Sequence, residues 1–257
     1  MKHPLRTLLL AVCCGLAAAC TQRQERLKLM SYNIRNGIGI DNIQDIGRIA
    51  RVILREAPDL VALQELDSAT LRADGRYIPG ELGRMTVMHA TFGRAIGFAG
   101  GSYGIGLLSR TEPLAVRSIP LPGREEARVL LMAEFPDYTV CITHLSLTPE
   151  DRLASLPIIR EATDTCRKPV LLAGDFNTGN AAAVLAGLGG GFRILSDTTR
   201  MTFPSDNPAV RIDYILGRGL PTSATVAESA VDHTATASDH CPLWVTLVWK
   251  RGKQPGK

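Results

Sequence analysis

The stretch Pro169-Val170-Leu171-Leu172-Ala173-Gly174-Asp175-Phe176-Asn177 joins an apolar run to an acid and an amide. An apolar run of this length predicts a buried strand, so Asp175 and Asn177 fall where that strand ends. A second stretch of the same kind, Ser238-Asp239-His240, stands at the mouth of the apolar segment 242–249. In both places acid, amide or imidazole groups lie beside a strand end, where they can converge on a hard cation and a phosphate.

The first part of the chain alternates strand-like and helix-like segments. Residues 27–33 alternate as a strand does, and the apolar residues of 43–54 recur at helical spacing. Residues 60–65 form a second apolar strand whose last residue, Glu65, is a carboxylate. With 45% hydrophobic and 21% charged residues and no composition break inside the chain, we expect a single α/β domain with a sizeable core.

The middle of the chain has weaker signals. Residues 67–102 are irregular and Gly-rich, with a short helix expected around 81–88. Residues 104–109 resume as a strand, and a hairpin is expected from 130–135 and 139–145, whose second strand ends at His144. The last two strands are expected at 211–216 and 242–249.

A helix is expected after the hairpin. Thr148 and Pro149 have the chemistry of an N-cap and a first helical residue. Leu153, Leu156 and Ile159 would form its apolar stripe, and Pro157 is expected to kink or shorten it because proline lacks the amide hydrogen of a helix interior.

Taken one at a time, the polar residues at these strand ends have ordinary structural explanations. An Asn or Asp can stabilise a turn, a lone His is more often structural than catalytic, and Asp213 can simply pair with its neighbour Arg211. Together they match the needs of a metal-dependent phosphoesterase: oxygen ligands for magnesium, an imidazole held by a carboxylate to move a proton, and neutral donors for phosphate oxygens. Asn33, Glu65 and Asp239 would supply the oxygen ligands, and His240 would be the base that Asp213 orients. Asn177 and His144 would donate to the phosphate, and Asp175 would be a second acid nearby.

Six short motifs in this order resemble the endonuclease/exonuclease/phosphatase superfamily. They are Ser31-Tyr32-Asn33-Ile34-Arg35, Ala62-Leu63-Gln64-Glu65, Thr143-His144-Leu145, Gly174-Asp175-Phe176-Asn177, Arg211-Ile212-Asp213-Tyr214-Ile215 and Ser238-Asp239-His240. The resemblance implies an α/β fold, a four-layer α/β/β/α sandwich of two mixed sheets with the site at one edge. It also implies hydrolysis by in-line attack of water on a phosphodiester or phosphomonoester, without a covalent enzyme intermediate.

The resemblance also assigns roles to residues. Glu65 would be the principal ligand of Mg²⁺, or of Mn²⁺, helped by Asn33 and Asp239 directly or through water. His240, held by Asp213, would activate the water or stabilise the pentacovalent phosphorus, and Asp175 is the rival general base. Asn177 would hold a phosphate oxygen, and His144 would donate to the phosphate or to the leaving oxygen.

The N-terminal segment is typical of an exported bacterial lipoprotein. Residues 1–19 have a basic start, a short apolar core and small residues before Cys20, as a lipoprotein-type signal peptide does. Cys20 would be lipidated and residues 20–26 would tether the domain 27–249 to a membrane, with 250–257 as a polar tail. An ordinary secretory peptide cut after Ala19 is the alternative. Either way we expect an exported protein, periplasmic or anchored to the cell envelope.

Charge and cysteine content say more about partners than about fold. The formal net charge is +4, and two of these charges, Lys2 and Arg6, lie in the proposed leader. A nucleic-acid enzyme usually has a basic face, so a lipid headgroup or a small phosphate ester is the favoured substrate. An exported nuclease is the first alternative and a catalytically inactive binding lipoprotein the second.

The cysteines predict neither a disulfide framework nor a metal site. Those that remain after the leader and Cys20 are odd in number and lack zinc-type spacing. We expect a monomer.

The sequence Thr143-His144-Leu145 indicates which branches of the superfamily the chain resembles. This signature is similar to that of secreted nucleases, sphingomyelinases, inositol-phosphate phosphatases and deadenylases, whereas abasic-site repair enzymes differ there. In the Gly-rich loop 97–104, Tyr103 can contact substrate or can be a packing aromatic.

Overall fold

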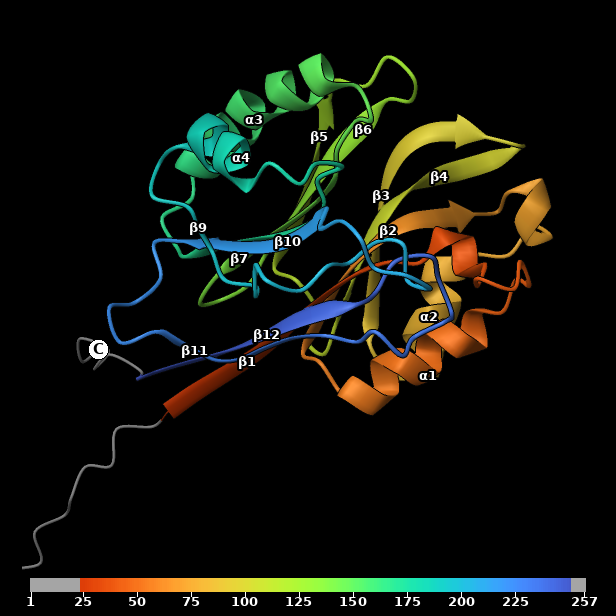
Figure 1. Ribbon diagram of the computed structural model, residues 1–257, viewed down its shortest axis with the longest axis horizontal. Coiled ribbons are helices and arrows are strands. Elements are labelled where there is room, and N and C mark those ends of the chain that lie inside the picture. The colour runs from red at the N-terminus through yellow and green to blue at the C-terminus, as the bar shows by residue number, and fades with distance from the viewer. Residues whose placement is uncertain (1–23, 251–257) are drawn as a thin grey trace, which may run out of the picture.

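The computed structural model describes residues 24–250, which form two six-stranded sheets packed face to face between two pairs of helices (Figure 1). Helices α1 (Ile46–Glu56) and α2 (Ile78–Thr86) cover the outer face of one sheet, and α3 (Pro149–Asp164) and α4 (Ala181–Leu188) cover the other. This arrangement confirms the predicted α/β/β/α sandwich of two mixed sheets.

The first sheet has the strand order β11-β12-β1-β2-β4-β3. Strands β1 and β2 are parallel, with α1 as the crossover between them, whereas the other neighbours are antiparallel. Short 3₁₀ turns at Arg35–Gly37 and Leu71–Ala73 flank these elements. The strands are β1 (Gln24–Asn33), β2 (Leu60–Ser68), β3 (His89–Phe98), β4 (Gly101–Ser109), β11 (Thr225–Val231) and β12 (Leu243–Lys250).

The second sheet repeats this design in the order β5-β6-β7-β8-β10-β9. Its parallel pair is β7 and β8, joined by α3. Each sheet therefore has one pair of parallel strands whose carboxyl ends lie side by side. The strands are β5 (Ala115–Leu121), β6 (Arg128–Glu134), β7 (Thr139–His144), β8 (Val170–Asp175), β9 (Arg193–Ile194) and β10 (Asp213–Arg218).

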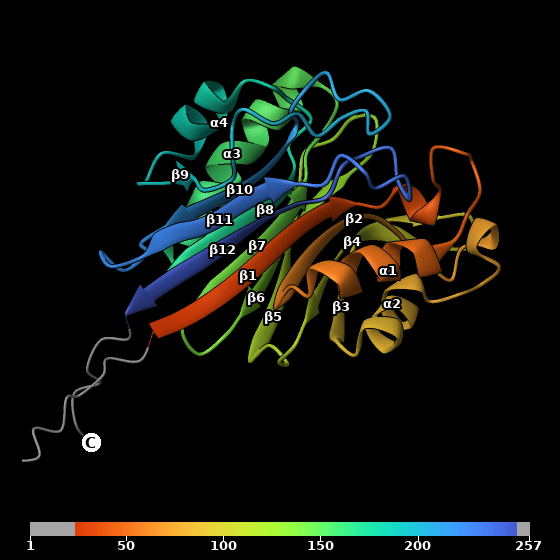
Figure 2. The same ribbon diagram turned by 60° about the horizontal axis from the view of Figure 1, so that its bottom comes forward.

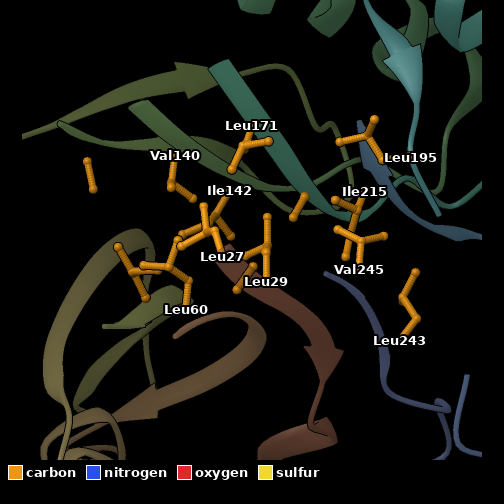
Figure 3. Close-up of a cluster of buried hydrophobic side chains, with 14 of the residues drawn as sticks. Leu27, Leu29, Leu60, Val140, Ile142, Leu171, Leu195, Ile215, Leu243 and Val245 are labelled. Carbon is orange, nitrogen blue, oxygen red and sulfur yellow. The ribbon is translucent and has the colours of Figure 1, made fainter. Parts of the chain in front are cut away.

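Side-chain alternation builds three apolar layers. Leu27 and Leu29 of β1 point between the sheets, where they pack with residues such as Leu171 and Ile215 of the opposite sheet (Figure 3). Met30 and Tyr32 alternate with them and face α1 and α2 instead. Both faces of the central strands are buried, which explains the apolar runs at 60–63 in β2 and 170–173 in β8.

Helix α3 differs from its prediction. It continues through Pro157 for all of its 16 residues, and Leu153 is 56% exposed and so does not join an apolar stripe. Leu156 and Ile159, on either side of Pro157, are buried against the second sheet. Packing of these residues stabilises the helix although Pro157 cannot donate to the preceding turn.

The irregular segment expected at 67–102 is largely ordered structure. It contains the end of β2, helix α2 and the whole of β3, which pairs with β4 as a hairpin. Strand β3 lies at a sheet edge, and its exposed and half-buried residues do not alternate regularly. Sequence periodicity therefore has little to detect there. Strands β5 and β11 and helix α4 were likewise not expected.

The ends of the described chain lie far from the carboxyl ends of the parallel strands. Gln24 at the start of β1 pairs with Lys250 at the end of β12, and β1 runs from there toward Asn33 (Figure 2). The proposed signal peptide 1–19, Cys20, most of the tether 20–26 and most of the tail 250–257 fall outside the described residues. Within 24–250, no helix has the length and apolar character needed to cross a bilayer.

Candidate active site

The two sheets bring their polar strand ends together at one edge of the sandwich. In the second sheet, His144 of β7, Asp175 of β8 and Asp213 of β10 lie in a row because β8 pairs with both neighbours at Asp175. The first sheet contributes Asn33 at the end of β1 and Glu65 in β2, and His240 precedes β12. All eight residues singled out from the sequence lie in this region, joined by contacts or by a shared cleft.

Asp175, His240 and Asp213 form a buried acid-imidazole-acid arrangement. His240 Nδ1 lies 2.9 Å from Asp213 Oδ2, and His240 Nε2 lies 3.7 Å from Asp175 Oδ2. The three residues are no more than 5% exposed. The other oxygen of Asp213, Oδ1, is buried without a hydrogen-bond partner among the described residues. Asp213 thus fixes the orientation of the imidazole and leaves Nε2 directed toward Asp175.

Burial and charge shift the pKa values of this arrangement. Burial raises the pKa of Asp175 to about 7, and the negative charge of Asp213 adds to the rise. Burial lowers the pKa of His240, but the charge and hydrogen bond of Asp213, together with the charge of Asp175, outweigh this effect and raise it to about 10. Near neutral pH the imidazole is therefore positively charged, and Asp175 is close to its titration point.

The Asn33 amide ties the two sheets together. The backbone N–H of Arg35, which can only donate, points to Asn33 Oδ1 at 3.1 Å. The amide nitrogen consequently faces the site, where it donates to Glu65 Oε1 at 2.9 Å and to Asp175 Oδ2 at 3.2 Å. In this orientation Asn33 positions two carboxylates. Its role as an oxygen ligand stays a prediction.

Glu65 was expected at the end of a strand, but it lies at a β-bulge inside strand β2. Strand β2 continues to Ser68, and its register with β4 shifts between Leu63 and Leu66. Glu65 itself has a left-handed backbone, with φ of 59°. A bulge inserts an extra residue and redirects a side chain, so this distortion turns the Glu65 carboxylate toward Asn33.

His144 and Asn177 flank Asp175. His144 Nε2 lies 3.5 Å from Asp175 Oδ2, and burial, with the charge of Arg128, lowers the pKa of His144 well below its usual range. Asn177 has a left-handed backbone, and its N–H donates to Asp175 Oδ1 at 2.8 Å. The Asn177 side chain donates to Leu145 O at 2.8 Å. His144 is therefore a neutral imidazole, and Asn177 braces the loop after β8.

The oxygen-bearing groups could hold a divalent cation. Glu65 and Asp239 line one open cleft of about 360 Å³, and Asp239 is 31% exposed at its side chain with Arg35 Nε 3.5 Å away. Two carboxylates and amide or water oxygens suit a hard cation such as Mg²⁺ or Mn²⁺. Asp175, Asp213 and His240 are also close enough to share an ion. However, the Asp213–His240 hydrogen bond already occupies Nδ1, so the donor set that fits a metal best contains Glu65 and Asp239.

The cleft also contains residues that were not anticipated. These residues are Glu126, Arg128 and Phe203. Tyr103, for which a contact with substrate was considered from the sequence, also lines the cleft and is 8% exposed. The Phe203 ring packs against His240 at a centroid distance of 4.8 Å. A larger hollow of about 470 Å³ lies at the opposite end of the second sheet, but its lining contains a single acid, Glu134, and no histidine. Only the contacts between distant segments reveal these additional wall residues.

The chain matches the model of the Endonuclease/Exonuclease/phosphatase family over residues 30–240. It belongs to this family. The match begins in β1 and ends at His240, so it contains every residue of the site described above. Members of the family hydrolyse phosphate esters, and the residues gathered here are the types that such chemistry requires.

Solved structures of the family share the fold. An endonuclease/exonuclease/phosphatase from Beutenbergia cavernae DSM 12333 is 24% identical, with a TM-score of 0.69 over 88% of this chain and 72% of that chain. A mannosyl-6-phosphatase from Bacteroides thetaiotaomicron VPI-5482 is 18% identical, with a TM-score of 0.67 over 86% and 99%. D. rerio TDP2 complexed with a single strand DNA product is 22% identical, with a TM-score of 0.65 over 86% and 98%. None of the curated proteins is similar in sequence.

Proposed function

We propose that this protein is a metal-dependent phosphoesterase that cleaves a small phosphate ester by attack of an activated water. The observation that carries the proposal is the single cleft in which Glu65, Asp175 and His240 meet, with His240 held by Asp213. A purely structural cluster would not need a cleft beside it that a ligand can enter. The same observation argues against an inactive binding lipoprotein, because every group that the chemistry needs is present.

Asp175 is the better candidate for the general base. Its pKa of about 7 lets it take a proton near neutral pH, whereas His240, with a pKa of about 10, is already protonated. A protonated His240 can donate to an oxygen of the phosphate and stabilise the charge that develops there. His144, which is neutral, can donate to the phosphate or the leaving oxygen.

A divalent cation would be held by Glu65 and Asp239. When bound, it would neutralise charge on the phosphate and on the leaving group. Asn33 would keep the Glu65 carboxylate in place through the hydrogen bond from its amide nitrogen. The Arg35 guanidinium beside Asp239 balances part of the negative charge of this donor set.

The position of the N-terminus favours a water-soluble ester over a headgroup of the anchoring membrane. Strand β1 begins at Gln24 and reaches the site at Asn33, a distance of about 30 Å at 3.3 Å per residue. If Cys20 is lipidated, the four residues 20–23 add no more than about 14 Å. The site would then lie at the end of β1 that is remote from the anchor. A nuclease is less favoured because Glu126 and Arg128 in the cleft wall form a pair of opposite charges and not the basic groove that a nucleic acid requires.

Turnover with and without metal tests the proposed function. We expect the protein to hydrolyse p-nitrophenyl phosphate or bis-p-nitrophenyl phosphate with Mg²⁺ or Mn²⁺, to lose at least about 90% of this activity in excess chelator, and to recover it when the ion is restored. Release of p-nitrophenol measures the rate, and circular dichroism shows whether the chelated protein stays folded. Hydrolysis that is unaffected by chelator would contradict the metal requirement. A folded protein inactive on every ester would contradict the activity.

Membrane attachment is a separate proposal, based on the sequence before residue 24. Cys20→Ser should release the protein from the membrane fraction, because a short polar segment without acyl chains has little affinity for a bilayer. Fractionation followed by immunodetection measures the change, with Cys166→Ser, a half-buried position in the domain, as the control. Persistent membrane association of Cys20→Ser would rule out the lipid anchor.

A further inference from the structure

Glu126 and Arg128 form a charged pair in the cleft wall that the hydrolytic groups do not use. Arg128, the first residue of β6, is 6% exposed, and its Nη1 lies 2.9 Å from Glu126 Oε1. Both residues line the cleft that contains Glu65 and His144. The Nε atom of Arg128 is buried without a hydrogen-bond partner among residues 24–250. A guanidinium this deeply buried with one N–H unpaired is the kind of group that a ligand completes.

The wall that carries the pair is held rigidly. Arg128 Nη2 lies 3.4 Å from Glu125 Oε1. Glu125 in turn accepts hydrogen bonds from Ser146 Oγ at 2.7 Å, from Leu147 N at 2.7 Å and from Thr148 Oγ1 at 3.1 Å. These bonds fix the loop that follows His144 to the start of β6. The pair is therefore pre-organised beside the site, so that binding to it requires little ordering of side chains.

The chemistry of the pair selects among leaving groups. An ionised carboxylate can accept about four hydrogen bonds, so Glu126 keeps acceptor capacity after pairing with Arg128. A carboxylate next to a guanidinium offers acceptors and donors together, which matches adjacent hydroxyl groups. An apolar alcohol would cover the pair without using its remaining hydrogen-bonding capacity, at a cost in affinity. A polynucleotide would bring further phosphates, which need an excess of basic groups that a pair of opposite charges does not supply.

We propose that Glu126 and Arg128 bind hydroxyl groups of the alcohol that is esterified to phosphate, and that this alcohol is a polyol such as a sugar or a cyclitol. The inference deepens the proposed function and rests on the same cleft. Glu126 and Arg128 lie in the cleft wall beside Tyr103 and His144, which places the polyol on the His144 side of the phosphate. The shared chemistry is a phosphorylated polyol, whether free in solution or displayed as a lipid headgroup.

Binding in the presence of chelator tests the subsite independently of turnover. Calorimetry should show that the wild-type protein binds a hexose 6-phosphate about tenfold or more tightly than phenyl phosphate, and that Glu126→Gln removes this difference, because it replaces a charged acceptor by a neutral amide of the same size. Glu161→Gln, on the exposed face of α3, is the matched control and should behave as the wild type. Equal affinities in the wild type, or an unchanged preference in Glu126→Gln, would overturn the subsite.

Kinetics separate this proposal from the proposed function. In the metal-loaded protein, Glu126→Gln should lower the ratio of kcat/KM for the hexose 6-phosphate to that for p-nitrophenyl phosphate by about tenfold, mainly through KM. An equal loss on both esters would mean that Glu126 acts on the hydrolytic groups and is no polyol subsite. A binding preference without turnover of any ester would support the subsite and reject the hydrolase. Glycerophosphoinositol compared with phosphatidylinositol vesicles distinguishes a free polyol phosphate from a headgroup.

Discussion

Glu65→Gln is expected to reduce kcat/KM on a generic phosphate ester by on the order of a thousandfold. The substitution removes the charge of the principal proposed cation ligand, yet the glutamine carbonyl can still accept the hydrogen bond from Asn33 Nδ2 that Glu65 Oε1 accepts now. Glu65 is half-buried and lies at a bulge, so no core contact is lost. Steady-state rates and calorimetric titration with Mg²⁺ or Mn²⁺ measure the two effects.

Stability separates a ligand from a structural residue. The melting temperature of Glu65→Gln should stay within about 3 °C of the wild type, because a substitution that leaves the core intact changes the free energy of unfolding by little. Glu161→Gln on α3 again serves as the matched control and should keep full activity. A folded Glu65→Gln protein with wild-type turnover or undiminished metal affinity would remove Glu65 from the metal site.

His240→Ala should lower kcat by roughly a hundredfold or more, the scale on which proton-transfer groups contribute. The imidazole Nε2 lies beside Asp175, and Nδ1 is held by Asp213 at 2.9 Å. Removing the ring also leaves Asp213 buried without its ion-pair partner, so His240→Ala is expected to be less stable. Activity must therefore be compared at a temperature where circular dichroism shows the variant to be folded.

Asp213→Asn tests the proposed role of His240 without removing the imidazole ring. The negative charge of Asp213 raises the pKa of His240, so its loss should lower that pKa. If a protonated His240 stabilises the phosphate, the alkaline limb of the kcat/KM profile should move to lower pH in Asp213→Asn. Unchanged turnover in His240→Ala, or an unmoved alkaline limb in Asp213→Asn, would show that His240 does not take part in proton transfer or charge stabilisation.

Most of the fold could be predicted from local patterns. The apolar runs at β2 and β8 and the alternation of β1 arise because each strand must bury one or both faces, and burial leaves a periodicity in sequence. Edge strands such as β3 bury little and leave no such trace. Helix α3 continues through Pro157, where a break was expected, because packing of Leu156 and Ile159 against the second sheet stabilises the helix.

The sequence by itself determined the family, the two-sheet architecture and the set of residues that gather at the edge of the sandwich, because short motifs carry the residue types that the chemistry requires. Only the tertiary structure decided how those residues are arranged. The bulge that turns Glu65 inward, the Asn33 amide held by Arg35 N–H, and the Glu126–Arg128 pair in the wall depend on backbone pairing and on contacts between segments far apart in the chain. Such contacts leave no periodic signal in the sequence.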